Sequence, residues 1–65
     1  MRGVVSEFDD PAGLGTITSV DGQTFAFHCT QIADGSRTIP VGTPVRFKMA
    51  PGHLGKWEAV AITPV

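Results

Sequence analysis

The chain has 65 residues, with five basic and six acidic side chains and a formal net charge of −1 at pH 7. This length allows one small domain, residues 1–65, with a modest core. Cys29 is the only cysteine, which excludes an internal disulfide and a cysteine-based structural zinc site. The charge balance lacks the basic excess that is usual where binding relies on phosphate contacts.

Two kinds of targeting segment are missing from the sequence. No apolar run approaches the roughly 20 residues that a membrane-spanning helix requires. No apolar stretch of about 7–15 residues follows Arg2, as it would in a signal peptide. Together with a lone thiol, which fits a reducing compartment, these features predict a soluble cytoplasmic protein that does not enter a membrane.

Short runs rich in Val, Ile, Thr and Phe alternate with eight Gly and five Pro, and no helical periodicity is present, so an all-β fold is predicted. Asp21-Gly22 predicts a hairpin with a type I′ turn, because that turn needs positive φ at both central residues. The longest loop is expected over 30–42, with its tip at 34–36. The five expected strands cover residues 3–8, 14–20, 24–28, 44–49 and 57–62.

Five short antiparallel strands with a long third connection predict a closed barrel, which leaves no sheet edge exposed. Period-two alternation then assigns each side chain to a face. Trp57 is expected to point outward with Ala59 and Ala61. The outer face of the second and third strands is expected to carry Leu14, Thr16, Ala26 and His28. The predicted core consists of Val5, Ile17, Phe25, Phe27, Val45, Phe47, Val60 and Ile62.

The order of motifs resembles the cold-shock domain over nearly the whole chain. Residues 3–9 match the family's opening G-K-V-K-W-F-N, and residues 12–17 match its motif K-G-F-G-F-I. Residues 25–32 match V-F-V-H-F-S-A-I, residues 38–47 match T-L-x-x-G-x-x-V-x-F, and residues 55–62 resemble the closing segment. The resemblance implies a five-stranded barrel of the oligonucleotide-binding (OB) type that binds single-stranded RNA or DNA.

The family binds single strands by stacking bases on exposed aromatic rings, and this face has diverged here. The resemblance leaves His28 and the edge of Phe8 as remnants of the platform. The loss of several stacks, each worth about 1–3 kcal/mol, predicts weakened binding. The family's exposed aromatic positions hold Glu7, Leu14, Thr16, Ala26 and Cys29, and its nearby lysines are replaced by Val4, Ser6 and Ala12.

Each remaining candidate has two interpretations. His28 either contacts a base or phosphate or is an exposed strand residue without a role. Trp57, beside Lys56, is either a relocated stacking ring or a cover for one barrel end. Glu7 on this face would either repel phosphate or pair with a basic neighbour. The basic side chains either contact phosphate or are scattered solubilising charges: Arg37, Arg46, Lys48 and Lys56.

Other chemistries are not supported by the sequence. His28 and Cys29 are adjacent on a strand and point to opposite faces, and His53 lies in a different loop, so no metal site is predicted. The segment around Gly15 lacks the Lys-Ser/Thr ending of a phosphate-binding loop, and no catalytic set is evident, so neither an enzyme nor a cofactor is expected.

Two hypotheses about function remain. The first is a single-stranded RNA- or DNA-binding protein with weak or altered affinity, whose interface includes Phe8, Leu14, Thr16, His28, Arg46, Lys56 and Trp57. The alternative is a diverged barrel that has lost nucleic-acid binding and serves as a protein-interaction or self-association module, for example as a homodimer. The acidic balance and the mild, partly apolar face motivate the alternative.

Overall fold

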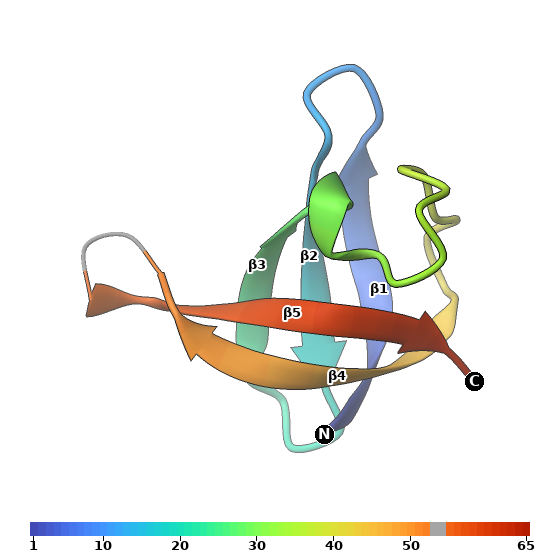
Figure 1. The fold of residues 1–65 in the computed structure, drawn as a ribbon. Coiled ribbons are helices and arrows are strands. Elements are labelled where there is room, and N and C mark those ends of the chain that lie inside the picture. The colour runs from blue at the N-terminus through green and yellow to red at the C-terminus, as the bar shows by residue number, and fades with distance from the viewer. Residues whose placement is uncertain (53–54) are drawn as a thin grey trace.

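A computed structural model describes residues 1–52 and 55–65 of the protein (Figure 1). All five predicted strands are present, and several are longer than predicted. They are β1 (Arg2–Asp9), β2 (Leu14–Ser19), β3 (Thr24–His28), β4 (Pro44–Pro51) and β5 (Trp57–Pro64). A 3₁₀ turn, η1 (Cys29–Gln31), follows β3 at the start of the long loop.

The strands form a closed barrel in the order β1-β2-β3-β5-β4, which confirms the predicted fold class. One detail differs, because β3 and β5 are parallel, with Ala26 opposite Glu58. A ring of five strands cannot alternate direction at every neighbour, since alternation closes only for an even number. One parallel pair is therefore a geometric necessity. It joins β3 to β5, which are separated along the chain by the long loop and β4.

The core fills the barrel and is sealed by the loop between β3 and β4. The predicted core is confirmed except for Val60, which is only half-buried. The loop adds Ile32 and Ile39, and hydrogen bonds to β1 hold it in place: Val5 N–H donates to Thr43 O at 3.0 Å and Gly42 N–H donates to Val5 O at 2.7 Å. The buried apolar residues are Val5, Ile17, Phe25, Phe27, Ile32, Ile39, Val45, Phe47, Ala59 and Ile62.

A β-bulge at Ala61 explains why Val60 is not in the core. The register between β4 and β5 shifts between Arg46 and Lys48, and Ala61 has a positive φ of 52°. The extra residue resets the alternation, so that Ala59 and Ile62 point inward while Ala61 is exposed. The prediction that Ala59 lies on the outer face is therefore wrong, because uninterrupted alternation was assumed.

The turn between β2 and β3 also differs from its prediction. Within it only Gly22 has positive φ, at 91°, whereas a type I′ turn needs two such residues. Gly22 N–H donates to Ser19 O at 2.9 Å, and Ser19 N–H donates to Gln23 O at 2.7 Å. These bonds describe a longer loop built on a tight turn with glycine at its end. Asp21 keeps an ordinary backbone because the loop is four residues long, and its side chain bonds back to the turn.

Candidate nucleic-acid interface

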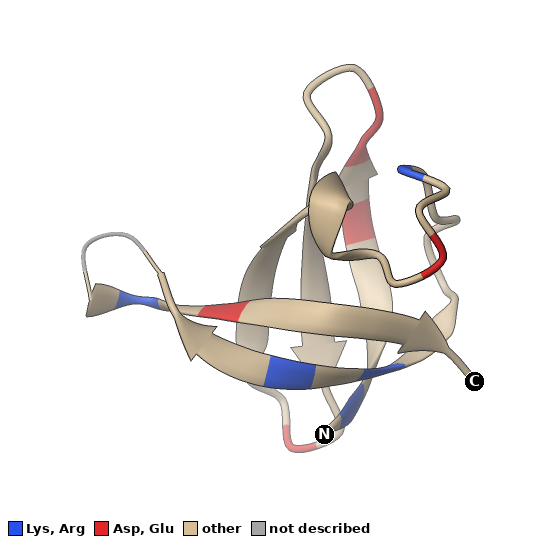
Figure 2. Ribbon diagram, in the orientation of Figure 1, with Lys and Arg blue, Asp and Glu red and all other residues tan. Residues whose placement is uncertain are grey.

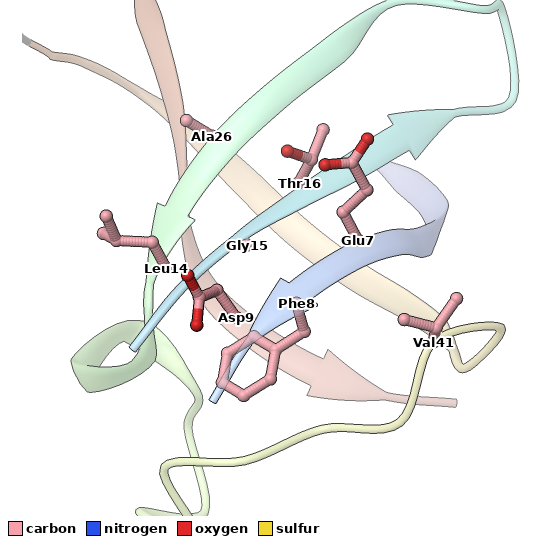
Figure 3. A pocket seen from close by; sticks show the side chains of 8 residues that line it. All are labelled: Glu7, Phe8, Asp9, Leu14, Gly15, Thr16, Ala26 and Val41. Atoms are coloured by element: carbon pink, nitrogen blue, oxygen red, sulfur yellow. The ribbon is translucent and has the colours of Figure 1, made fainter. Parts of the chain in front are cut away.

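The outer face of β1, β2 and β3 brings the predicted residues into two cross-strand rows (Figure 3). In the first row Asp9 lies opposite Leu14, which lies opposite His28. In the second row Glu7 lies opposite Thr16, which lies opposite Ala26. Leu14 is 53% exposed, so an apolar side chain here is presented to solvent rather than to the core.

A second bulge, on β1, decides which side chains reach this face. The register with β2 shifts between Val5 and Glu7, leaving Ser6 without a direct partner. Ser6 Oγ donates to Thr16 O at 3.2 Å and accepts from Thr18 Oγ1 at 3.0 Å. After this bulge Glu7 is exposed and Phe8 is half-buried, whereas alternation from Val5 would have turned Glu7 inward.

Phe8 packs toward the interior, above a glycine. It lies opposite Gly15 on β2, and Gly15 lies opposite Phe27 on β3. The rings of Phe8 and Phe27 stack with centroids 5.9 Å apart and planes at 11°. A Cβ at Gly15 would overlap the Phe27 ring and lie 2.8 Å from Glu7 O. The Phe8 ring is therefore committed to packing, and only its remaining exposed part borders the surface.

A hollow of about 630 Å³ lies over these rows, lined by Glu7, Phe8, Asp9, Leu14, Gly15, Thr16, Ala26 and Val41. We call it the β1–β3 hollow. Its lining carries two carboxyl groups and no basic side chain. Val41 comes from the long loop, which the sequence reading of this face did not include because loop placement depends on the tertiary fold.

A second hollow of about 870 Å³ lies between the β2–β3 hairpin and the start of β5. We call it the Trp57 hollow. Lys56, Trp57 and Glu58 form one wall, and residues 22–26 with Thr16 form the other. Figure 1 shows the β4–β5 ribbon extending past β3, which leaves Trp57 55% exposed. Thr16 and Ala26 line both hollows, so the two candidate sites are contiguous.

His28 has a structural role besides its exposed position on the interface. Its side chain caps η1, with Thr30 N–H donating to Nδ1 at 3.2 Å and Thr30 Oγ1 3.0 Å from the same nitrogen. A ring nitrogen that accepts carries no proton, so the neutral ring bears its hydrogen on Nε2. That N–H is the group available to a ligand.

The basic candidates are distributed over several parts of the molecule (Figure 2). Lys56 borders the Trp57 hollow, while Arg46 and Lys48 lie on the exposed face of β4. Arg37 lies in the long loop with a positive φ of 60°. The structure thus brings Leu14, Thr16, Lys56 and Trp57 onto one continuous surface and places Arg46 elsewhere.

Among the residues that the structure describes, there is neither a cluster of metal-ligating side chains nor a membrane-spanning helix. Over 1–52 and 55–65 no three His, Cys, Asp or Glu side chains are grouped as metal ligands would be. Cys29 Sγ lies 3.9 Å from His28 Nδ1, and His53 is outside the described residues. Within the same ranges, no helix has the length and apolar character needed to cross a bilayer.

Comparisons with known proteins yield a match at the level of structure. No family model and no curated protein matches the sequence. A solved structure described as Drosophila Unr CSD456, which contains cold-shock domains, superposes with a TM-score of 0.80 and 25% identity. The match covers 98% of this chain but only 26% of the Unr chain.

The structural match agrees with the motif order read from the sequence and with the closed five-stranded barrel. The cold-shock domain is a nucleic-acid-binding and non-enzymatic kind of domain. The chain therefore has the fold of a cold-shock domain, and the motif order and the structural match both support that family.

Proposed function

We propose that this cold-shock domain binds single-stranded RNA or DNA without catalysing a reaction, with lower affinity than a typical family member, along the surface formed by the two hollows. The observation that carries the proposal is their continuity through Thr16 and Ala26. A strand lying on the β1–β3 hollow meets, at its end, an exposed indole beside a lysine. This pair supplies a stacking ring and a phosphate contact.

The reduced affinity follows from what the β1–β3 hollow has lost. Leu14, Thr16 and Ala26 present no ring, and Phe8 is stacked on Phe27. Glu7 and Asp9 add negative charge where phosphates would approach, which opposes binding at low salt. Trp57, Lys56 and the Nε2–H of His28 are the groups that remain to hold a strand.

A titration with oligo-dT of about six nucleotides, within the site size of one such barrel, tests the proposal. Amide NMR shifts and Trp57 fluorescence are followed at low salt. We expect shifts that run from Leu14 through Thr16 to Trp57, with quenching of the indole. If no signal changes up to millimolar ligand, the binding proposal is wrong and a protein partner for the partly apolar face becomes the hypothesis to pursue.

The role of the indole is tested by three variants. Trp57→Ala should weaken binding by about 5- to 150-fold, corresponding to one stack of about 1–3 kcal/mol, while Trp57→Phe should retain most of the affinity. Met49→Ala is the matched control, because Met49 is also a large exposed apolar side chain of the β4–β5 ribbon but lines neither hollow. Equal losses in Trp57→Ala and Met49→Ala would contradict a stacking role.

A test of His28 must separate its capping of η1 from any contact that its imidazole ring makes with a ligand. His28→Ala removes both, whereas His28→Asn keeps a side-chain acceptor that can cap η1. We expect both variants to bind oligo-dT more weakly, with His28→Asn closer to the wild type in thermal stability. Wild-type affinity in His28→Asn would show that the imidazole only holds the turn.

A further inference from the structure

Three basic side chains gather on a part of the barrel that the proposed interface does not use. Arg2 on β1 lies directly opposite Arg46 on β4, and Lys48 shares the exposed face of β4 with Arg46. In the closed order β1-β2-β3-β5-β4, β4 adjoins β1 and β5, so it lies across the barrel from β2 and β3. We call Arg2, Arg46 and Lys48 the basic surface (Figure 2).

The basic surface contains a depression. A hollow of about 310 Å³ is lined by Met1, Arg46, Phe47, Lys48, Ala61 and Thr63. The bulge at Ala61 places a one-carbon side chain between longer neighbours, which leaves space between Arg46 and Lys48. Phe47 beneath is buried, so the hollow offers cations at its rim and no exposed ring. Such a site suits phosphate rather than a base.

The charge distribution singles out this region in a chain of net charge −1. Glu7 and Asp9 line the β1–β3 hollow on the far side, and Glu58 lines the Trp57 hollow. The carboxylate in the turn next to Arg2 is Asp21, which already accepts from Ser19 Oγ and from Gln23 N–H. Two arginines directly opposite on neighbouring strands repel each other, so their placement favours an external anion that relieves the repulsion.

We propose that the basic surface binds backbone phosphates of the same nucleic acid whose bases occupy the Trp57 hollow, at a separate site on the barrel. Arg46 and Lys48 are two residues apart on a strand, or about 6.6 Å, close enough to contact neighbouring phosphates of one strand. The contacts carry no base readout and depend strongly on salt. The inference rests on the proposed function for its ligand class and adds a second site to it.

The test compares 5′-labelled oligo-dT of about six and about 20 nucleotides, lengths chosen to fill one barrel site and to exceed it. Fluorescence anisotropy gives the affinity at several KCl concentrations. For the 20-mer we expect Arg46→Gln to reduce the slope of log K against log salt by about 0.7, and the triple Arg2, Arg46 and Lys48 to Gln variant by about 2. The 6-mer affinity should stay unchanged in both variants.

Arg37→Gln is the matched control, because it removes an identical charge at a residue that lines none of the three hollows. Equal slopes for Arg46→Gln and Arg37→Gln would contradict phosphate binding by the basic surface, because a change in net charge would then explain both results. A 20-mer that fails to bind the wild type would also overturn it. If the 20-mer binds through Arg46 while the 6-mer does not bind, phosphate binding by the basic surface is supported and base binding at the Trp57 hollow is contradicted.

Discussion

At the scale of single residues, Gly15 is the position where one hydrogen decides the packing. Its missing side chain lets Phe8 and Phe27, on the two neighbouring strands, stack across it. The stacked rings cover the backbone of β2 and hold three strands together, as flanking aromatic residues do for glycines in other sheets. The close neighbours that leave no room for a side chain at Gly15 are the Phe27 ring and the Glu7 carbonyl.

Gly15→Ala should destabilise the protein by about 1–3 kcal/mol, because the added Cβ must displace the Phe27 ring or the β1 backbone. Denaturant unfolding measures the change. The double variant Gly15→Ala with Phe27→Leu should show a smaller loss than the sum of the two single variants, since the shorter side chain removes the overlapping ring atoms. Strict additivity would contradict this account.

Asp21 should make the stability depend on pH at the acid end. The Ser19 hydroxyl, and then the Gln23 N–H, stabilise its carboxylate and lower the pKa of Asp21 below its usual 3.8. Because the folded-state value is the lower one, the stabilisation is present above the unfolded value and is lost as pH falls through the folded value. The thermal midpoint of Asp21→Asn should therefore differ from that of the wild type at neutral pH, and the difference should shrink in acid. A gap that is constant with pH would refute the charge effect.

At the scale of elements, two bulges determine which faces the strands present. The bulge at Ser6 turns Glu7 outward and Phe8 inward, and the bulge at Ala61 exchanges Val60 for Ala59 in the core. Both occur where a strand must bend to close a small barrel. The functional consequences are direct, because the first shapes the β1–β3 hollow and the second opens the hollow between Arg46 and Lys48.

Ala61→Gly should stabilise the protein by about 0.5–1 kcal/mol. The left-handed backbone at φ 52° costs alanine about 1–2 kcal/mol, more than the added flexibility of glycine costs in a strand. Ala59→Gly is the matched control two residues away on the same strand. Ala59 is fully buried and has no positive φ, so that variant should lose about 1–2 kcal/mol. Thermal unfolding of both variants checks the opposite signs.

At the scale of the whole molecule, a nearly neutral chain separates its charges over the barrel surface. Carboxylates at the end of β1 line the β1–β3 hollow, while the basic surface lies on the start of β1 and on β4 (Figure 2). This segregation is not visible in the net charge of −1. It arises because barrel closure sets β1 beside β4, which brings Arg2 next to Arg46 although 43 residues separate them in the sequence.

The repulsion between Arg2 and Arg46 gives a stability prediction that is independent of any ligand. Arg46→Gln should raise the thermal midpoint at low salt, by a few tenths of a kcal/mol in unfolding free energy, because directly opposed like charges destabilise a strand pair. The gain should disappear in about 1 M salt, where the Debye length is about 3 Å. Arg37→Gln should show no comparable gain, and an equal gain there would indicate a general charge effect.

The sequence alone determined the strand positions, the turn sites and most of the core, because these depend on local signals: period-two alternation, glycine and proline. The order of motifs over the chain also indicated the resemblance to the cold-shock domain, which the structural match supports. The sequence could not determine which face of the sheet the side chains occupy after Ser6 and after Ala61. A bulge depends on how two strands pair with each other, and the residues of one strand do not reveal it.

Only the tertiary structure decided how the candidate residues combine. Trp57 and Leu14 are 43 positions apart, and the sequence assigned both to the interface without showing how they meet. Closure of the barrel places β5 beside β3, and the shared Thr16 and Ala26 join the two hollows into one surface. The same closure separates Arg46 from Lys56, which the sequence had grouped by charge. Contacts between distant strands fix these relations, and no local pattern records them.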